Sequence, residues 1–203
     1  MQDLIPGLRL AELLAARLCH ELVSPVGAIA NGVEILEDEP GFARDAARLI
    51  EQSAREARLR LQFYRIAYGS VGDVAVELAR KAADAFFADG KIACDWPETL
   101  DFPPGAAKLA CNLLLVAAEA LPRGGRVALA AGDPRRLLSV VAEGGDARLH
   151  DRVAELLTLP SAVDSLTPRQ AQPVFTAALA WRLGARIETV RHSPEMIEFA
   201  VNR

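Results

Sequence analysis

One short stretch of the chain combines residue types that can perform nucleophilic and acid–base chemistry. It runs from Leu18 to Pro25, and within it His20 is followed directly by Glu21 and, five residues later, by Pro25. One ring nitrogen of a neutral imidazole can act as a nucleophile while an adjacent carboxylate accepts the proton of the other. Proline has no backbone N–H, so Pro25 leaves the carbonyl of Glu21 without its helical partner, and the helix should bend or loosen there.

The helix that carries this stretch is expected to expose His20. Between about Leu8 and Glu37, apolar residues recur at helical spacing. The apolar stripe is centred on Leu18, Ile29 and Leu36. At roughly 100° per residue, His20 falls nearly opposite that stripe. The residues that share its side are Ser24, Gly27 and Asn31. A surface histidine without a chemical role fits this periodicity too, so the spacing to the proline carries the functional hypothesis.

A second helical run follows from about Phe42 to Ile66, after the turn signal at residues 37–41. Two long helices joined by a short Pro-Gly turn predict an antiparallel hairpin. A single hairpin leaves much of its apolar stripe uncovered. Two copies packed as a four-helix bundle would bury it, so we expect a homodimer.

The pattern changes near Gly69–Gly72, where we place a domain boundary between residues 1–69 and 70–203. The second part alternates helix and strand signals, which makes the fold class α+β: a helical hairpin followed by an α/β sandwich. Helices are expected at residues 73–88, 103–121, 149–157 and 168–183, and strands at 91–96, 126–131, 137–142, 186–191 and 196–201. Gly184 should end the last helix at its C′ position.

Composition limits the function classes. With 51% hydrophobic and 25% charged residues the chain is globular, and its net charge of −4 without a basic block argues against nucleic-acid binding. The cysteines are odd in number and lack C-x-x-C spacing, which favours reduced thiols in the cytoplasm. They are Cys19, Cys94 and Cys111. No signal peptide is expected, and the apolar run near residues 109–121 is too short to cross a membrane.

The run L-C-H-E-L-V-S-P-V resembles the phosphoacceptor box of dimeric sensor histidine kinases, S-H-E-L-R-T-P-L. The resemblance implies that His20 is phosphorylated, that Glu21 assists as a base and that Pro25 bends the helix. Val23 and Ser24 stand at the basic and Thr/Asn positions of that box, so the match departs from the family pattern there.

The second part resembles the ATP-binding domain of these kinases in its order of elements and lacks its motifs. Asn112 matches the first asparagine of the N-box, and Val116 stands where the Mg²⁺-ligating asparagine belongs. Ala142 or Glu143 replaces the adenine-reading aspartate. No G-x-G-L-G-L loop precedes the last helix, and the lid is a short connection at residues 158–167. The resemblance therefore implies a nucleotide-binding fold that no longer binds nucleotide.

Together these features resemble the ChpT-type histidine phosphotransferases of alphaproteobacteria over essentially the whole chain. That resemblance implies a phosphorelay step linked to cell-cycle regulation. His20 would take a phosphoryl group from the receiver-domain aspartate of a hybrid histidine kinase and pass it to the aspartate of a response regulator. No cofactor is expected on the chain, and Mg²⁺ belongs to the partner receiver domains. The alternatives are a divergent active histidine kinase and a non-catalytic interaction or inhibitor protein.

Receiver docking is expected on the hairpin surface around His20. The candidate docking residues are Ala16, Arg17, Val23, Ser24, Gly27, Arg58, Leu61, Gln62 and Arg65. Ordinary surface charge explains the arginines equally well. We expect His150 and His192 to be surface residues and Cys19 to be a packing residue. Trp96 and Trp181 should anchor the core or rim of the second part.

Overall fold

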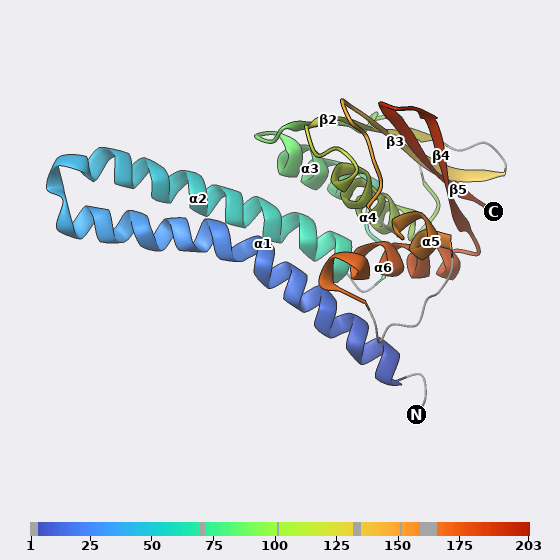
Figure 1. Ribbon diagram of the computed structural model, residues 1–203, viewed down its shortest axis with the longest axis horizontal. Helices are drawn as coiled ribbons and strands as arrows, with labels where there is room; N and C mark the ends of the chain where they lie inside the picture. Colours follow the sequence, from blue (N-terminus) through green and yellow to red (C-terminus); the bar gives the residue numbers. More distant parts are fainter. Residues whose placement is uncertain (1–3, 70–71, 101, 132–134, 151, 159–165) are drawn as a thin grey trace.

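A computed structural model describes residues 4–69, 72–100, 102–131, 135–150, 152–158 and 166–203. The chain begins with a long helical hairpin that projects from a mixed α/β body (Figure 1). Helix α1 (Leu4–Asp38) and helix α2 (Ala43–Tyr64) run antiparallel and are joined by a 3₁₀ turn, η1 (Pro40–Phe42). Helix α2 continues into a π-helical turn, η2 (Arg65–Gly69). This turn leads the chain into the α/β body.

Helix α1 contains a proline and is apolar over most of its length. Pro25 lies inside it, and Figure 1 shows the helix changing direction part-way along. Among the described residues, the segment Gly7–Asp38 is the one helix long and apolar enough to cross a membrane by length and composition alone. Core helices of globular proteins pass the same test, and α1 packs here against α2 and α6.

In the part of the chain that the structure describes, the α/β body contains one five-stranded sheet and four helices. Its elements are α3 (Val76–Phe87), β1 (Ile92–Asp95), α4 (Ala106–Glu119), β2 (Gly125–Ala131), β3 (Arg136–Glu143), α5 (Val153–Thr158), α6 (Pro168–Arg182), β4 (Arg186–Ser193) and β5 (Met196–Asn202). The strand order is β1-β2-β3-β5-β4, with β1 and β2 parallel and the other pairs antiparallel. The predicted α+β fold class is confirmed.

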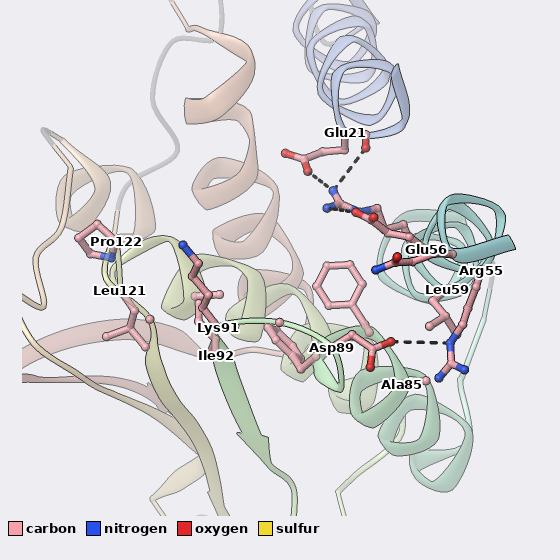
Figure 2. A pocket seen from close by; sticks show the side chains of 17 residues that line it. Glu21, Arg55, Glu56, Leu59, Ala85, Asp89, Lys91, Ile92, Leu121 and Pro122 are labelled. Atoms are coloured by element: carbon pink, nitrogen blue, oxygen red, sulfur yellow. Dashed lines mark hydrogen bonds and ion pairs between the residues drawn. The ribbon is translucent and has the colours of Figure 1, made fainter. Parts of the chain in front are cut away.

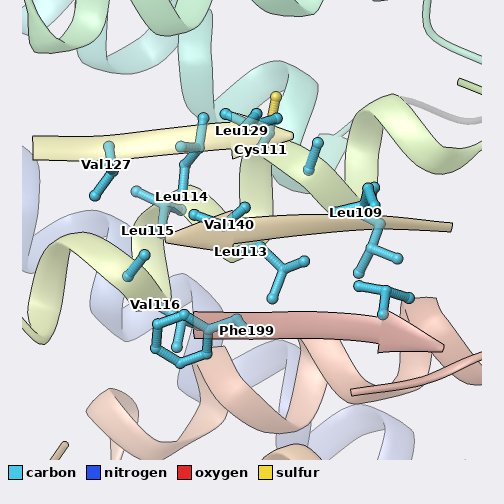
Figure 3. Packing of buried hydrophobic residues seen from close by; sticks show 14 of the residues in the cluster. Leu109, Cys111, Leu113, Leu114, Leu115, Val116, Val127, Leu129, Val140 and Phe199 are labelled. Atoms are coloured by element: carbon cyan, nitrogen blue, oxygen red, sulfur yellow. The ribbon is translucent and has the colours of Figure 1, made fainter. Parts of the chain in front are cut away.

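Helix α4 forms the centre of the core. All residues from Ala106 to Ala117 are buried, because the helix is covered by the sheet on one side and by other helices on the other. Figure 3 shows its leucines packed against Val127 and Val140 of the sheet, with Phe199 beside Val116. Burial of a leucine or phenylalanine side chain contributes about 1.5–3 kcal/mol. Burial of this layer therefore stabilises the body by several such contributions.

The hairpin shares this core with the α/β body. Phe63 at the end of α2 stacks on Phe86 of α3 with ring centroids 4.5 Å apart, and Phe63 belongs to the same buried cluster as α4. Lower on α1, Leu13 is buried with Leu156 and Val174 of α5 and α6. The base of the hairpin is thus held on two sides, and its far end stands clear of the body (Figure 1).

Some expected element bounds differ from the structure for local reasons. The helix expected from residue 103 begins at Ala106, because two prolines and Gly105, which has a left-handed φ of 83°, precede it. The helix expected at residues 149–157 is only Val153–Thr158. The π-turn after Tyr64 was not predicted. Gly184 does adopt the left-handed conformation expected after α6, with φ of 68°.

Candidate functional site

His20 lies on the exposed side of α1. Ser24, Gly27 and Asn31 are exposed along the same side, as the helical projection predicted. Within the described part of the chain, the imidazole has no hydrogen-bond or ion-pair partner. The ring is therefore accessible to a second molecule. Its phosphorylation stays a prediction.

Glu21 faces the second helix of the hairpin. Arg60 Nη1 donates to Glu21 Oε2 at 2.7 Å and also to the backbone carbonyl oxygen of Glu21 at 3.3 Å (Figure 2). That carbonyl is the one that Pro25 cannot satisfy, because proline lacks the N–H. Pro25 itself is buried. A base role for Glu21 stays a prediction, and the structure adds that its carboxylate is already paired.

Arg60 is itself held in place from within α2. Glu56 Oε1 accepts from Arg60 Nε at 3.1 Å and from Nη2 at 2.7 Å. Burial alone would lower the pKa of Arg60, but the charges of Tyr64 and Glu56 and the hydrogen bond to Glu56 raise it overall. Burial, followed by the charge of Glu21, raises the pKa of the neighbouring Tyr64 to about 12. The phenol is therefore neutral near pH 7.

Arg17, one turn before His20, joins α1 to the α/β body. Its guanidinium is only 12% exposed and donates to Glu119 at the end of α4. Burial lowers the pKa of Arg17, but the charges of Glu119, Tyr68 and Glu21 and the hydrogen bond to Glu119 together raise it overall. The side chain that was expected to face a docking partner is thus engaged within the chain. Its docking role stays a prediction.

The other candidate docking residues are mostly accessible. Val23 is 69% exposed and Leu61 is 53% exposed, so both offer apolar surface to a second molecule. The remaining ones, Ala16, Ser24, Gly27, Arg58, Gln62 and Arg65, are also exposed. No partner chain is present, so docking by any of them stays a prediction.

A cleft of about 550 Å³ lies between the hairpin and the α/β body, beside the helix turn that carries His20 (Figure 2). Glu21 and Leu59 line it from the hairpin, and Phe86 and Lys91 line it from the body. Arg55 reaches Asp89 at 3.7 Å across the mouth of this cleft. Both charged and apolar side chains therefore face the same space.

The position that matches the Mg²⁺-ligating asparagine of the kinases is buried. Val116 is 3% exposed and lines a cavity of only about 10 Å³, together with Glu119 and Pro173. Asn112, also fully buried, donates to the carbonyl of Ala67 at 2.8 Å and accepts from Gln172 Nε2 at 3.0 Å. Its side chain links α4 to η2 and α6. The predicted lid at residues 158–167 falls largely outside the described residues.

Sequence reasoning missed Arg60 and Glu119, the two partners that hold the helix carrying His20. A usable signal was present for Arg60. Pro25 must leave the Glu21 carbonyl unpaired, and in an antiparallel hairpin Glu21 and Arg60 lie at similar chain distances from the turn. No comparable pattern pointed to Glu119, because it follows from the packing of the body on α1.

The remaining singled-out residues lie away from His20. His150 and His192 are exposed, as expected, and His192 pairs with Glu198 at 2.9 Å. Trp96 is buried and Trp181 is 50% exposed at the rim. Cys19 is exposed, so the prediction that it packs inside is wrong for a single chain. Among the described residues, no three His, Cys, Asp or Glu side chains cluster as metal ligands.

Comparison with known proteins places this geometry in a family. Residues 76–194, more than half of the chain, match the sequence profile of the histidine phosphotransferase C-terminal domain. The protein phosphotransferase ChpT of Brucella abortus (strain 2308) is 36% identical over 205 aligned residues, covering 97% of this chain and 96% of that protein. The chain belongs to the ChpT-type histidine phosphotransferases. The interpretation of the sequence as a member of this family is confirmed.

One solved structure agrees with this assignment to the ChpT-type family. A bacterial phosphotransferase superposes with a TM-score of 0.82 at 35% identity, covering 96% of each chain. The histidine kinase AdeS of Acinetobacter baumannii also matches, with a TM-score of 0.41 at 13% identity over 90% of this chain and 97% of that chain.

Proposed function

We propose that this phosphotransferase carries a phosphoryl group through His20 in a multi-step phosphorelay. The group would come from the receiver-domain aspartate of a hybrid histidine kinase and go to the aspartate of a response regulator. The observation that supports this most directly is the exposed imidazole of His20, which has no hydrogen-bond or ion-pair partner among the described residues. The chain also belongs to a family of protein phosphotransferases. The step needs no oxidant and no nucleotide.

The chemistry of each transfer is a displacement at phosphorus. A nitrogen of the neutral His20 ring attacks the aspartyl phosphate, and the N–P bond forms as the bond from phosphorus to the aspartate oxygen breaks. The electron pair of that bond returns to the aspartate carboxylate. The proton on the other ring nitrogen is then released. Arg60 contacts Oε2 of Glu21, and we assign this proton to Oε1 of the same carboxylate. A second receiver aspartate accepts the phosphoryl group by the reverse sequence.

The phosphate source in this proposal is a protein and not ATP. Val116 offers no oxygen ligand for Mg²⁺, and the cavity of about 10 Å³ beside it is far smaller than sites for small ligands, which are about 300–1,000 Å³. We therefore assign no cofactor to the chain and leave Mg²⁺ to the partner receiver domains. Docking would use the exposed surface around His20, with Val23 and Leu61 as apolar contacts.

We also propose a homodimer formed through the hairpins. Val26, Val33 and Leu36 are 56%, 42% and 37% exposed on α1, on the side away from His20. Pairing two hairpins along this side would bury these side chains and leave both imidazoles accessible. We assign the protein to the cytoplasm, where reduced cysteines and the proposed receiver partners would occur together.

Phosphotransfer from a labelled receiver tests the proposal. Receiver domains of the hybrid kinases from the same organism would be labelled with [³²P]acetyl phosphate, purified and mixed with the protein. Label should appear on the wild type within seconds and should be at background on His20→Ala. His192→Ala, which removes another exposed histidine, should be labelled like the wild type.

Three outcomes would overturn the proposal. Label that persists on His20→Ala, or never reaches the wild type from any receiver, would favour the interaction or inhibitor alternative. Label from [γ-³²P]ATP on the isolated protein would favour the divergent-kinase alternative. Each result is read on the same gel.

A further inference from the structure

Pro25 removes a hydrogen bond from the turn of α1 that carries His20. In a regular helix, the N–H of residue 25 would donate to the carbonyl of Glu21. Proline has no N–H, and an unpaired backbone carbonyl costs free energy wherever water does not reach it. In this hairpin the missing donor comes from another helix, since Arg60 Nη1 reaches that oxygen at 3.3 Å.

The same nitrogen of Arg60 also holds the side chain of the same residue. Arg60 Nη1 lies 2.7 Å from Glu21 Oε2, with the two side chains 29% and 33% exposed. A planar guanidinium has several donors in a fixed arrangement, so it can hold a carbonyl and a carboxylate at once. Arg60 therefore fixes both the backbone and the carboxylate of the residue next to His20.

Arg60 is restrained before it reaches α1. Its Nε and Nη2 both donate to Glu56 Oε1 from one turn earlier on α2. Buried Tyr64 lies within electrostatic range of both Arg60 and Glu21. A side chain anchored at both ends loses little further entropy when it holds Glu21, which makes it suited to positioning.

We propose that Arg60 is a positioning residue for phosphotransfer at His20. By replacing the hydrogen bond that Pro25 removes and by orienting the Glu21 carboxylate, it fixes the loosened turn in the geometry that the transfer requires. This inference rests on the proposed function and adds a residue from α2 to the site. A displacement of about 1 Å at a reacting group can cost roughly 100-fold in rate.

The position of Arg60 separates this role from partner docking. At roughly 100° per residue, Arg60 lies on the far side of α2 from Arg58 and Gln62. Those two side chains are exposed and were predicted to dock receivers, whereas Arg60 faces α1. Loss of Arg60 should therefore slow the transfer itself, and loss of Arg58 should weaken receiver binding.

Single-turnover transfer from a phosphorylated receiver tests the inference. Arg60→Gln should lower the maximal rate about 10- to 100-fold and leave the half-saturating receiver concentration within about twofold. The matched control Arg58→Gln should raise that concentration and keep the maximal rate. Arg60→Lys, which keeps one charged donor, should recover part of the loss. Circular dichroism at the assay temperature checks that each variant is folded.

Two double-mutant cycles show whether Arg60 acts through Glu21 and Pro25. In the Pro25→Ala background, residue 25 regains its N–H, so Arg60→Gln should cost less than in the wild type. In the Glu21→Gln background, the loss from Arg60→Gln should also shrink. Equal losses in all three backgrounds would overturn the inference, as would a wild-type maximal rate in Arg60→Gln.

The failure of this inference is distinguishable from failure of the proposed function. If the wild type takes no label from any receiver, the proposed function fails. If the wild type and Arg60→Gln take label at the same maximal rate, the relay stands and the positioning role is wrong.

Discussion

The two tyrosines of the chain, Tyr64 and Tyr68, lie at the base of the hairpin, where α1, α2 and the α/β body meet. Tyr68 donates its hydroxyl hydrogen to Gln172, and Tyr64 is buried near Glu21 and Arg60. Burial raises the pKa of Tyr64 to about 12 and raises that of Tyr68 as well. The pKa values of both phenols therefore depend on whether the hairpin stays packed against the α/β body.

Absorbance at 295 nm should report this junction directly, because the chain has only two tyrosines. The folded state holds their protons more tightly than the unfolded state, whose tyrosines ionise near pH 10. The free energy of unfolding should therefore fall as the pH rises from about 10 through 12. We expect little ionisation below about pH 11 while the far-UV circular dichroism remains native. The urea-unfolded chain is the control, and a native-state midpoint near pH 10 would contradict the prediction.

At the residue scale, the exposure of most candidate residues could be predicted from the sequence. Their long-range contacts could not, for a physical reason. The exposure of His20 follows from helical periodicity, which is a local property. Asn112 was expected as a remnant of a nucleotide motif, and its hydrogen bonds to Ala67 and Gln172 give it a structural role. Such contacts depend on how distant elements pack, and no local pattern encodes them.

At the element scale, the hairpin helices approach closely at one glycine. A Cβ atom at Gly32 would lie 2.6 Å from Ile50 Cγ1 and 3.3 Å from the carbonyl oxygen of Ala46. A Cβ at Gly27, on the same helix, would meet nothing within 4 Å. Gly32 therefore sets the spacing between α1 and α2, and Gly27 does not.

Alanine substitutions at these two glycines should change stability in opposite directions. Gly27→Ala should raise the free energy of unfolding by up to about 1 kcal/mol, because alanine is the better helix former. Gly32→Ala gains the same propensity but forces Ile50 and the backbone apart, which costs roughly 1–3 kcal/mol. Urea denaturation should therefore show Gly32→Ala to be the less stable of the two. Equal free energies of unfolding for the two variants would mean that α1 and α2 can move apart at Gly32 without a loss of stability.

The helices and strands were largely predictable, and the bounds were less so. Long periodic segments such as α1 and α2 were located within a few residues of their ends. The start of α4 depends on the left-handed Gly105, and the π-turn at Arg65–Gly69 depends on packing against α4. The strand order could not be derived from strand signals alone, because several orders satisfy the same pattern.

At the scale of the whole molecule, the hairpin is covered at its base and bare at its far end (Figure 1). The α/β body contacts α1 through Arg17 and Leu13, and it contacts α2 through the aromatic cluster around Phe63. The exposed apolar side chains Val26 and Val33 lie beyond these contacts on α1. In the proposed dimer, a second hairpin would cover them.

A charge placed on this side should break the proposed dimer. Val33→Glu would place a carboxylate in the buried core of a four-helix bundle, where an unpaired charge is strongly unfavourable. Light scattering coupled to gel filtration should give a dimer for the wild type and a monomer for Val33→Glu. Leu78→Glu is the control, since Leu78 is 51% exposed on α3 and is not part of the hairpin helices. A dimeric Val33→Glu protein would rule out this interface.

The bridge from Arg60 to the carbonyl freed by Pro25 also changes how the histidine motif should be searched for in genomes. Read along the chain, the motif ends at the proline. In three dimensions it extends to an arginine that lies 39 positions after Glu21. A scan for histidine, glutamate and proline alone would accept chance matches. Requiring an arginine at the matching distance beyond the hairpin turn would separate sequences that have the histidine, glutamate, proline and arginine from sequences that have only the first three.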